Sequence, residues 1–415
     1  MIQLREHQIA VLDTLQKNSK GQIIVPTGGG KTMCMIEDAK YQFTKNSVSK
    51  TIVVVAPRIL LAEQLCEEFL EQNLDGQYNV GVDVLHVHSG ETDYKRLTKT
   101  EEIEEWYHNS IKNILIFTTY HSLHKISESL DIEVDTIYFD ESHNAVQKNF
   151  IHSVKYQSEY ANRCYFFTAT PKHSLSPHKV GMNYEPIFGK EIISVPAPDL
   201  IKQGYIIPPK VKSVKYSNHI GDTHIRDNET LINILENEDH MDKVLVTAKS
   251  TKDISRLITQ TDFQLKCHSL KYNVLWITSK FGAIINGVKV SRDKFFKIMN
   301  EWGANPDKKF IMFHHSILSE GMNVSGLSAC ILMRNLDYVT MSQTIGRVIR
   351  LHKEDIKNIS NGDLKPCNFD SYKKPFGKMF VPVYNNVGIS TERRLQTVVD
   401  TIFNKGEPAI SIVRK

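Results

Sequence analysis

The stretch "IIVPTGGGKT", from Ile23 to Thr32, largely decides how this chain is interpreted. An apolar run stops at a proline and is followed by three adjacent glycines, a lysine and a threonine. Glycine loses more conformational freedom on folding than any other residue, so three together indicate a loop whose backbone N–H groups approach a ligand closely. A lysine and a hydroxyl group directly after such a loop indicate that the ligand is a polyphosphate with its Mg²⁺. The predicted phosphate-binding residues are Thr27, Gly28, Gly29, Gly30, Lys31 and Thr32.

This stretch follows an apolar strand pattern and precedes a helical pattern, which is the context that a phosphate loop requires. Lys31 would neutralise the charge of the β- and γ-phosphates, and Thr32 would ligate Mg²⁺. The general pattern has glycine at position 25, where this chain has Val25. We expect the loop to tolerate this difference, because its tight turn lies at Gly28 to Gly30.

A phosphate loop predicts an acidic element at the end of another strand, and "TIYFDESH" provides one. Asp140 follows an apolar strand and would hold Mg²⁺ directly or through water, so the predicted metal ligands are Thr32 and Asp140. Glu141 could orient or deprotonate the attacking water. Acidic residues after a strand often only cap the next helix, but their combination with "TGGGKT" favours the catalytic interpretation.

Short apolar strands alternate with amphipathic helical stretches along most of the chain. Continuous Val, Ile and Phe runs such as "TIVVVA" at 51–56 indicate strands buried on both faces, joined by βαβ crossovers. The alternation stops between about 196 and 240, a region that contains "PAP", "PPK" and an Asn- and Asp-rich stretch, and then restarts. The predicted class is therefore α/β with two tandem doubly wound parallel sheets, in a domain of residues 1–205, a linker of 206–240 and a domain of 241–415.

Composition places the chain among ordinary globular proteins, with 41% apolar and 24% charged residues among 415. No run of eighteen apolar residues is present, and the start of the chain lacks a signal-peptide pattern, so we expect no membrane association. Six scattered cysteines without a CxxC pair are typical of a reducing compartment, which predicts a cytoplasmic protein.

The net charge of +4 is unevenly distributed along the chain. Residues 1–210 carry a balance of −5 and residues 211–415 a balance of +9. A basic second half is compatible with binding to a phosphate backbone, and equally with a pattern that serves solubility.

Four short segments, in this order, resemble motifs I, II, III and VI of superfamily 2 helicases. They are "TGGGKT", "DESH", "TATP" at Thr168 to Pro171 and "QTIGRVIR" at Gln343 to Arg350. The subgroup that the chain most resembles is the DExH type, which includes ATPase subunits of restriction enzymes and phage-type repair helicases. The resemblance implies two RecA-like domains with ATP and Mg²⁺ in the cleft between them.

Weaker matches follow from the same resemblance, residue by residue. Gln8 of "LREHQ" would read adenine, since its amide offers both a donor and an acceptor. Arg58 of "APRILLAEQ", Thr119 of "TTYHSL" and Thr247 of "VTAKS" would contact nucleic acid. Gly321 and Asn323 of "LSEGMNVSG" would lie near the nucleotide, although the family often has Asp at the position of Asn323.

"QTIGRVIR" would supply the remaining part of the ATP site. Arg347 and Arg350 lie three residues apart on a helical stretch, so they would share one face and stabilise charge on the γ-phosphate. The resemblance gives Gln343 a role in positioning water or in pairing with His143. The predicted catalytic residues are Lys31, Asp140, Glu141, Gln343, Arg347 and Arg350.

These features together predict an ATP-driven nucleic-acid helicase or translocase that acts on DNA rather than RNA. It would work as a monomer or within a larger complex. The alternatives are a duplex-DNA translocase subunit of restriction type that separates no strands, and an RNA helicase. A nucleotide-dependent clamp without turnover conflicts with the intact set of catalytic residues, and a small-molecule kinase would not need "QTIGRVIR".

Overall fold

The structure, a computed structural model, describes residues 4–45, 48–73, 81–129, 131–216, 222–315, 326–384 and 388–413. The chain forms two compact units. Unit 1 consists of Met1–Pro196 with Pro408–Lys415, and unit 2 consists of Ala197–Glu407. The last residues therefore belong to the unit in which the chain begins. The alternation of strands and helices in the sequence does not predict this return of the chain to unit 1.

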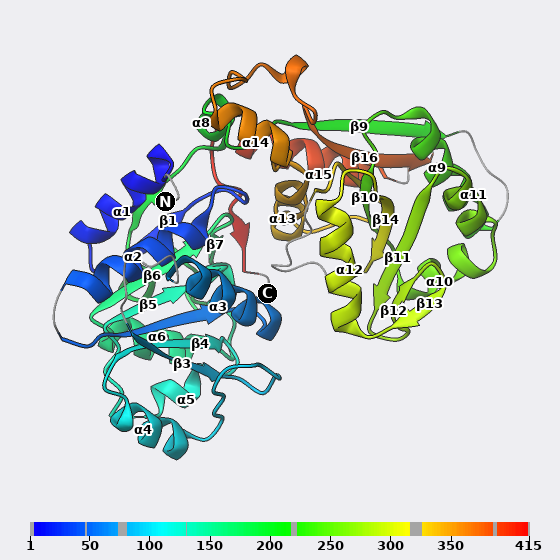
Figure 1. Cartoon of the computed structure of the whole chain (residues 1–415). Coiled ribbons are helices and arrows are strands. Elements are labelled where there is room, and N and C mark those ends of the chain that lie inside the picture. The colour runs from blue at the N-terminus through cyan, green and yellow to red at the C-terminus, as the bar shows by residue number, and fades with distance from the viewer. Residues whose placement is uncertain are drawn as a thin grey trace. The chain divides into compact units, whose positions relative to one another are not determined.

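Unit 1 is built on a sheet of seven strands in the order β3-β4-β2-β5-β6-β1-β8 (Figure 1). All neighbouring strands are parallel, so their carboxyl ends, and the loops that follow them, lie at one edge of the sheet. The strands are β1 (Lys20–Ile24), β2 (Thr51–Ala56), β3 (Val82–Val87), β4 (Asn113–Thr119), β5 (Thr136–Phe139), β6 (Arg163–Thr168) and β8 (Glu191–Ser194).

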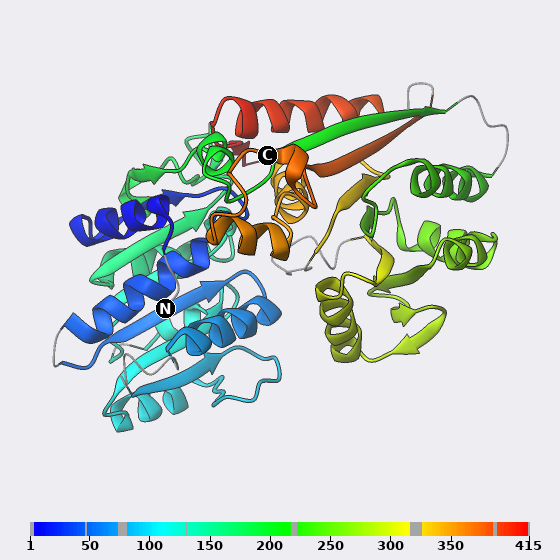
Figure 2. The same ribbon diagram turned by 45° about the horizontal axis from the view of Figure 1, so that its top comes forward.

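Helices cover both faces of this sheet. On one face α1, α2 and α3 pack side by side (Figure 2). On the other face α4, α5, α6 and α7 pack together. Apolar side chains that alternate along the strands, such as Val53 and Val55, are buried against α4 to α7, and each contributes about 1.5–3 kcal/mol. The helices are α1 (Glu6–Lys17), α2 (Lys31–Lys45), α3 (Ile59–Asn73), α4 (Thr100–Asn109), α5 (His124–Ser127), α6 (Ile151–Tyr160) and α7 (Glu185–Phe188). A short pair of strands, β7 (Lys172–His173) and β17 (Ser411–Ile412), completes the unit.

Unit 2 contains a sheet of eight strands in the order β13-β12-β11-β14-β10-β15-β16-β9. Six of them are parallel, and β12 and β13 form an antiparallel hairpin at one edge. The strands are β9 (Pro209–Tyr216), β10 (Lys243–Thr247), β11 (Tyr272–Thr278), β12 (Gly282–Ile285), β13 (Val288–Val290), β14 (Lys309–His314), β15 (Ala329–Leu332) and β16 (Gly377–Tyr384).

The second sheet is also covered on two faces. Helices α9, α10 and α11 pack together, while α12, α13 and α15 pack against the strands from the other side. The helices are α8 (Ala197–Lys202), α9 (Thr223–Asn237), α10 (Thr251–Thr259), α11 (Phe263–Ser269), α12 (Arg292–Ala304), α13 (Tyr338–Val348), α14 (Lys353–Ser360) and α15 (Ile389–Val399). The predicted class of two tandem α/β sheets is confirmed, and the antiparallel hairpin makes the second sheet mixed.

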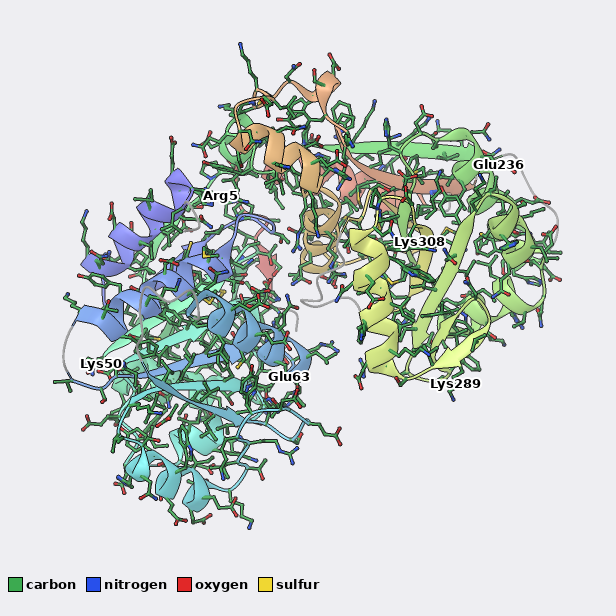
Figure 3. The ribbon with its side chains drawn as sticks, in the orientation of Figure 1. Arg5, Lys50, Glu63, Glu236, Lys289 and Lys308 are labelled. Atoms are coloured by element: carbon green, nitrogen blue, oxygen red, sulfur yellow. The ribbon has the colours of Figure 1, made fainter. Side chains whose placement is uncertain are left out.

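Two features of unit 2 differ from the sequence prediction. The interval 206–240, predicted as a linker, contains β9 and α9, and β9 pairs with β16 along its whole length. Its edge position and its exposed lysines hide the apolar pattern that marks interior strands. The β12–β13 turn is formed by Asn286 and Gly287, which both have positive φ, and Lys289 on β13 is labelled in Figure 3. Asn-Gly between apolar residues is a strong hairpin signal that the sequence interpretation missed.

Within the described ranges, no helix is long and apolar enough to cross a membrane.

Candidate nucleotide-binding and catalytic site

The phosphate loop lies between β1 and α2, at the carboxyl edge of the first sheet. Gly28 and Gly30 have φ values of 87° and 84°, a left-handed conformation that glycine adopts without steric cost. A Cβ atom on Gly30 would also come within 2.5 Å of the side-chain nitrogen of Gln8. The backbone of this turn therefore requires at least two of the three glycines.

Val25 occupies the position where the general loop pattern has glycine. Its side chain is buried, and its N–H donates to the carbonyl of Thr168 at 3.0 Å. This bond continues the pairing between β1 and β6 by one residue, so Val25 belongs to the strand end rather than to the turn. That placement explains why a side chain is accommodated here.

The beginning of α1 holds the three glycine carbonyls of the loop. The side-chain nitrogens of Arg5, His7 and Gln8 lie 3.5, 2.7 and 3.3 Å from the oxygens of residues 28, 29 and 30 in turn. In a trans peptide the N–H points away from its C=O, so these contacts turn the amides of Gly30 and Lys31 away from α1. Amides oriented in this way at a helix N-terminus are suited to phosphate oxygens.

The same contacts bear on the interpretation of "LREHQ". Gln8 is buried, its Oε1 accepts the N–H of Arg5 at 3.0 Å, and its amide nitrogen donates to Gly30. Its role in reading adenine stays a prediction. The sequence interpretation assigned only Gln8 and missed Arg5 and His7, although all three stand within five residues.

An acidic pair follows β5 at the same edge of the sheet. Asp140 and Glu141 are 6% and 8% exposed, and Glu141 has a φ of 46°, which is unusual for a residue with a side chain. The ammonium group of Lys31 lies 3.6 Å from a carboxylate oxygen of Glu141. The structure thus brings together the lysine of the loop and the acidic residues that the sequence selected.

Burial and the neighbouring carboxylate of Glu141 raise the pKa of Asp140 to about 7, while Lys31 opposes the change. Desolvation disfavours a carboxylate, and a second negative charge nearby disfavours it further. The carbonyl of Asp140 accepts a hydrogen bond from the hydroxyl of Tyr120 at 2.9 Å, which fixes the backbone at this point. A cation at this place would favour the ionised form.

His143 connects the acidic pair with the "TATP" segment. Its Nδ1 lies 3.5 Å from Glu141 Oε2 and 3.2 Å from the hydroxyl of Thr168. That hydroxyl also accepts the N–H of Thr170 at 3.1 Å. The pairing of His143 with Gln343 stays a prediction.

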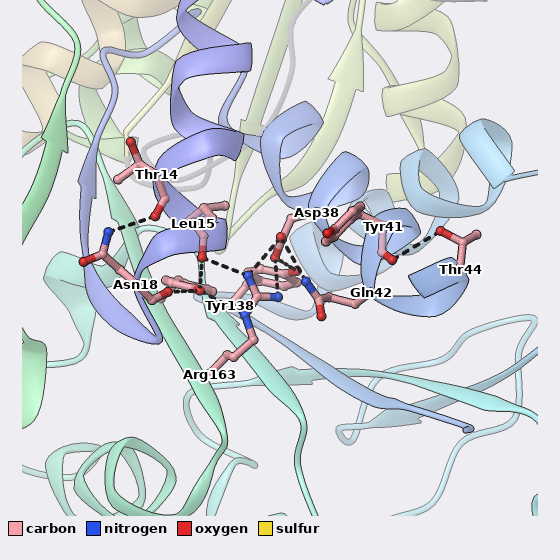
Figure 4. Close-up of polar contacts among 10 residues, drawn as sticks. Thr14, Leu15, Asn18, Asp38, Tyr41, Gln42, Thr44, Tyr138 and Arg163 are labelled. Atoms are coloured by element: carbon pink, nitrogen blue, oxygen red, sulfur yellow. Dashed lines mark hydrogen bonds and ion pairs between the residues drawn. The ribbon is translucent and has the colours of Figure 1, made fainter. Parts of the chain in front are cut away.

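Helix α2, which begins with Lys31, is fixed to the sheet by a buried polar cluster (Figure 4). Asp38 on α2 accepts hydrogen bonds from the guanidinium of Arg163 at 3.0 and 3.1 Å and from the hydroxyl of Tyr138 at 2.6 Å. Arg163 also donates to the carbonyl of Leu15 on α1. Since Tyr138 and Arg163 lie on β5 and β6, the cluster fixes the phosphate-loop helix relative to β5, the strand that Asp140 follows.

The residues at this edge fit Mg²⁺. Thr32 opens α2 beside Lys31, and the hydroxyl of Thr32 and the carboxylate of Asp140 are hard oxygen donors of the kind that Mg²⁺ prefers. In the described part of the chain no group of three or more His, Cys, Asp and Glu side chains could hold a metal ion. One or two protein ligands with waters and nucleotide phosphates is a common way of binding Mg²⁺.

Two predicted nucleic-acid contacts follow neighbouring strands of unit 1. Arg58 comes shortly after β2, and Thr119 ends β4 opposite Ala56. The side chain of Arg58 is exposed, whereas Thr119 is only 4% exposed. Of these two side chains, Arg58 is the better placed to reach a strand at the surface.

In unit 2 the "QTIGRVIR" residues lie on and after α13. The helix begins after Asp337, whose carboxylate accepts the N–H of Thr340 at 2.9 Å. Gln343 and Arg347 lie one helical turn apart and are each 5% exposed. The expected helical register does not extend to Arg350, because α13 ends at Val348 and Arg350 lies in the following bend.

The surroundings of Arg347 include a buried histidine, His314. His314 ends β14, and burial together with the charges of Arg347 and Arg334 lowers its pKa well below the usual value. The imidazole is therefore neutral. Thr247, which pairs with His314 in the sheet, is fully buried, so a contact between its side chain and nucleic acid stays a prediction. Gly321 and Asn323 lie outside the described residues.

Comparisons with known proteins agree with this geometry. Residues 1–173 match the profile of the family described as "Type III restriction enzyme, res subunit". No curated protein sequence matches the chain. Among solved structures, the ATP-dependent Type ISP restriction-modification enzyme LlaBIII bound to DNA is similar, with a TM-score of 0.72 and 15% sequence identity. The similarity covers 99% of this chain but only 31% of LlaBIII.

Smaller helicases are similar over most of their own length. Dbp5 of S. cerevisiae bound to RNA and ADP BeF3 has a TM-score of 0.57 and 14% identity, covering 98% of this chain and 89% of that one. Mss116p bound to ssRNA and AMP-PNP has a TM-score of 0.58 and 13% identity, covering 97% and 73%. These structures show that both sheets have the fold of tandem RecA-like domains.

Proposed function

We propose that this protein is a nucleic-acid motor that hydrolyses ATP, and that Lys31, Asp140 and Glu141 form the centre of its hydrolytic site. The observation that carries the proposal is the 3.6 Å ion pair between Lys31 and Glu141 at the carboxyl edge of the first sheet, beside the buried Asp140. Lys31 would exchange its contact with Glu141 for the γ-phosphate. Glu141 would then be available to orient the attacking water.

Each residue of the site has a separate task in this proposal. The amides of the loop hold the phosphates, and Thr32 and Asp140 hold Mg²⁺, which neutralises phosphate charge when bound. Arg347 and Arg350 of unit 2 supply guanidinium groups to the transition state, and Gln343 positions water. His143, held by Thr168, limits the positions that the Glu141 carboxylate can adopt.

DNA is the substrate that we propose first. The matching family profile belongs to a restriction-enzyme subunit, and LlaBIII, which has the highest TM-score among the similar structures named above, is bound to DNA. Dbp5 and Mss116p are bound to RNA, so an RNA helicase is the alternative within the same fold. The basic balance of residues 211–415 suits either backbone.

A second candidate function is translocation along duplex DNA without strand separation, within a larger complex. The likeness to LlaBIII favours it, since this chain corresponds to about a third of that enzyme. We propose the monomeric motor as the first possibility.

All six cysteines are free thiols and five are buried, which supports a reducing compartment such as the cytoplasm.

Phosphate release tests the proposal, measured with single-stranded DNA, duplex DNA, branched DNA and RNA. We expect stimulation by at least one of the DNA forms. Unwinding of a fluorescent duplex then identifies a helicase, and displacement of a third strand from a triplex without unwinding identifies a translocase. Stimulation by RNA alone would select the RNA helicase.

A further inference from the structure

A buried lysine in unit 2 holds the backbone behind the "QTIGRVIR" segment. Lys374 lies in the chain between α14 and β16 and is 6% exposed. Its ammonium donates to the carbonyl of Arg350 at 2.7 Å and to the carbonyl of Leu327 at 2.5 Å. One side chain therefore joins Arg350, two residues after the end of α13, to Leu327, two residues before the start of β15.

A buried carboxylate holds the backbone at Lys374 in place. The carboxylate of Asp355, on α14, accepts the N–H of Lys373 at 3.0 Å and the N–H of Lys374 at 3.2 Å. Asp355 is itself 1% exposed, so this contact is shielded from water. Burying an ammonium is costly unless its donors are satisfied, and here two carbonyls accept hydrogen bonds from two of its three donors.

Burial and the charge of Arg350 lower the pKa of Lys374 to about 7, and Lys243 acts in the same direction while Asp355 opposes it. A neutral amine can still donate two hydrogen bonds. The contacts to both carbonyls are therefore available on either side of neutral pH.

The carbonyls at the end of a helix lack partners within the helix and need them from elsewhere. After α13, the carbonyl of Ile349 accepts the N–H of Ile207 at 2.9 Å, and the carbonyl of Arg350 accepts Lys374. A donor with positive charge suits this end of a helix, where carbonyl dipoles point outward. Because Arg350 lies beyond the last helical residue, these two contacts fix its backbone in place of the helix.

We propose that Lys374 is a positioning residue for ATP hydrolysis, which sets the direction of the Arg350 side chain by holding the Arg350 carbonyl. This inference rests on the proposed function, because it concerns the arginine that we assign to the transition state. It adds a residue that makes no contact with the nucleotide and acts through Arg350. A displacement of about 1 Å in such a group can reduce the rate by roughly a hundredfold.

The test is a kinetic cycle on the full chain. Lys374→Met keeps the aliphatic length and removes the donors, and we expect kcat for ATP hydrolysis to fall about ten- to a hundredfold. KM and nucleotide affinity should stay unchanged, since the phosphate loop belongs to unit 1. In the background of Arg350→Ala, Lys374→Met should cause no further loss of kcat, because Lys374 acts only through the Arg350 side chain.

The neighbouring Lys373 provides a matched control. Its ammonium pairs with Glu354 and its side chain is 55% exposed, so Lys373→Met should leave kcat unchanged. If Lys374→Met fails to fold, Asp355→Asn is the second variant. It weakens the hold on the backbone of residues 373 and 374, and should give a smaller loss that also disappears beside Arg350→Ala.

Two results would overturn the inference. One is a wild-type kcat in Lys374→Met. The other is a double variant whose loss of kcat equals the product of the losses in Lys374→Met and Arg350→Ala, which would show that Lys374 has a general structural role. An inactive wild-type chain would instead contradict the proposed function, so the two failures are distinguishable.

Discussion

The two units hold their predicted catalytic residues in different ways. In unit 1, Lys31 and Glu141 come from separate elements and meet directly, at 3.6 Å, at one edge of the sheet. In unit 2, Arg347 is buried on a helix, and Arg350 lies beyond its end, where Lys374 holds the backbone. In the function that we propose, unit 1 holds the phosphate and metal site, and unit 2 supplies positive charge to the transition state.

The largest effect should come from removing that charge. Arg347→Ala with Arg350→Ala should lower single-turnover hydrolysis by about 10³- to 10⁵-fold, because guanidinium groups stabilise charge on the transferred phosphoryl group. Nucleotide affinity should change little. The exposed Arg393 on α15 serves as the control, and Arg393→Ala should behave as wild type. If the double variant lost nucleotide affinity as well as ATP hydrolysis, the difference between the two units would be contradicted.

Unit 1 should separate binding from chemistry within itself. Glu141→Gln should lower hydrolysis by about 10²- to 10⁴-fold, since it removes the water-orienting carboxylate. Nucleotide should still bind, whereas Lys31→Ala should lose affinity as well, because it removes a phosphate partner. Titration with a fluorescent nucleotide measures the difference, and Glu133→Gln at an exposed position is the control. Normal turnover by Glu141→Gln would contradict the assignment of Glu141.

A smaller effect concerns the stability of unit 1. The folded-state pKa of Asp140 is about 7, above the usual value of an aspartic acid. The protonated carboxyl group therefore contributes fully to the free energy of unfolding below about pH 4, and this contribution is lost as the pH rises to 7. Asp140→Asn should therefore raise the free energy of unfolding at pH 8 by about 1–3 kcal/mol. The free energy of unfolding should also decrease less between pH 5 and pH 8 in this variant than in the wild type. Urea unfolding at both pH values measures this, and an unchanged pH dependence in the variant would contradict it.

The smallest effects should lie at the predicted nucleic-acid contacts. Arg58→Ala should weaken the stimulation of hydrolysis by nucleic acid and lower the slope against log salt by about 1, because it removes one phosphate contact. Thr119→Ala should change stimulation less, since the side chain of Thr119 is buried. The basal rate should stay constant in both variants. Equal losses would show that burial does not decide between these two positions.

Much of unit 1 could be predicted from sequence, for physical reasons. Strands buried on both faces produce continuous apolar runs, so the predicted range of 51–56 agrees with β2. The loop glycines and the acidic pair carry local signals, because backbone conformation and charge are set by single residues. The contacts of Arg5 and His7 with the loop could not be predicted, since they depend on how α1 packs beside α2.

Unit 2 was less predictable. The edge strand β9 carries three lysines and begins with a proline, so its composition resembles a linker. The helical spacing of Arg347 and Arg350 suggested one face, but the end of a helix depends on partners for its last carbonyls, which come from Ile207 and Lys374. Such partners lie far away in sequence and leave no local pattern.

The central claim is that the site in unit 1 hydrolyses ATP for movement on nucleic acid. Steady-state phosphate release by the wild-type chain, with and without DNA or RNA, tests it most directly. The account predicts Mg²⁺-dependent hydrolysis that nucleic acid stimulates, that weakens as salt is raised, and that Glu141→Gln lowers by about 10²- to 10⁴-fold. A rate that no DNA or RNA changes, or one that persists in Glu141→Gln, would contradict it.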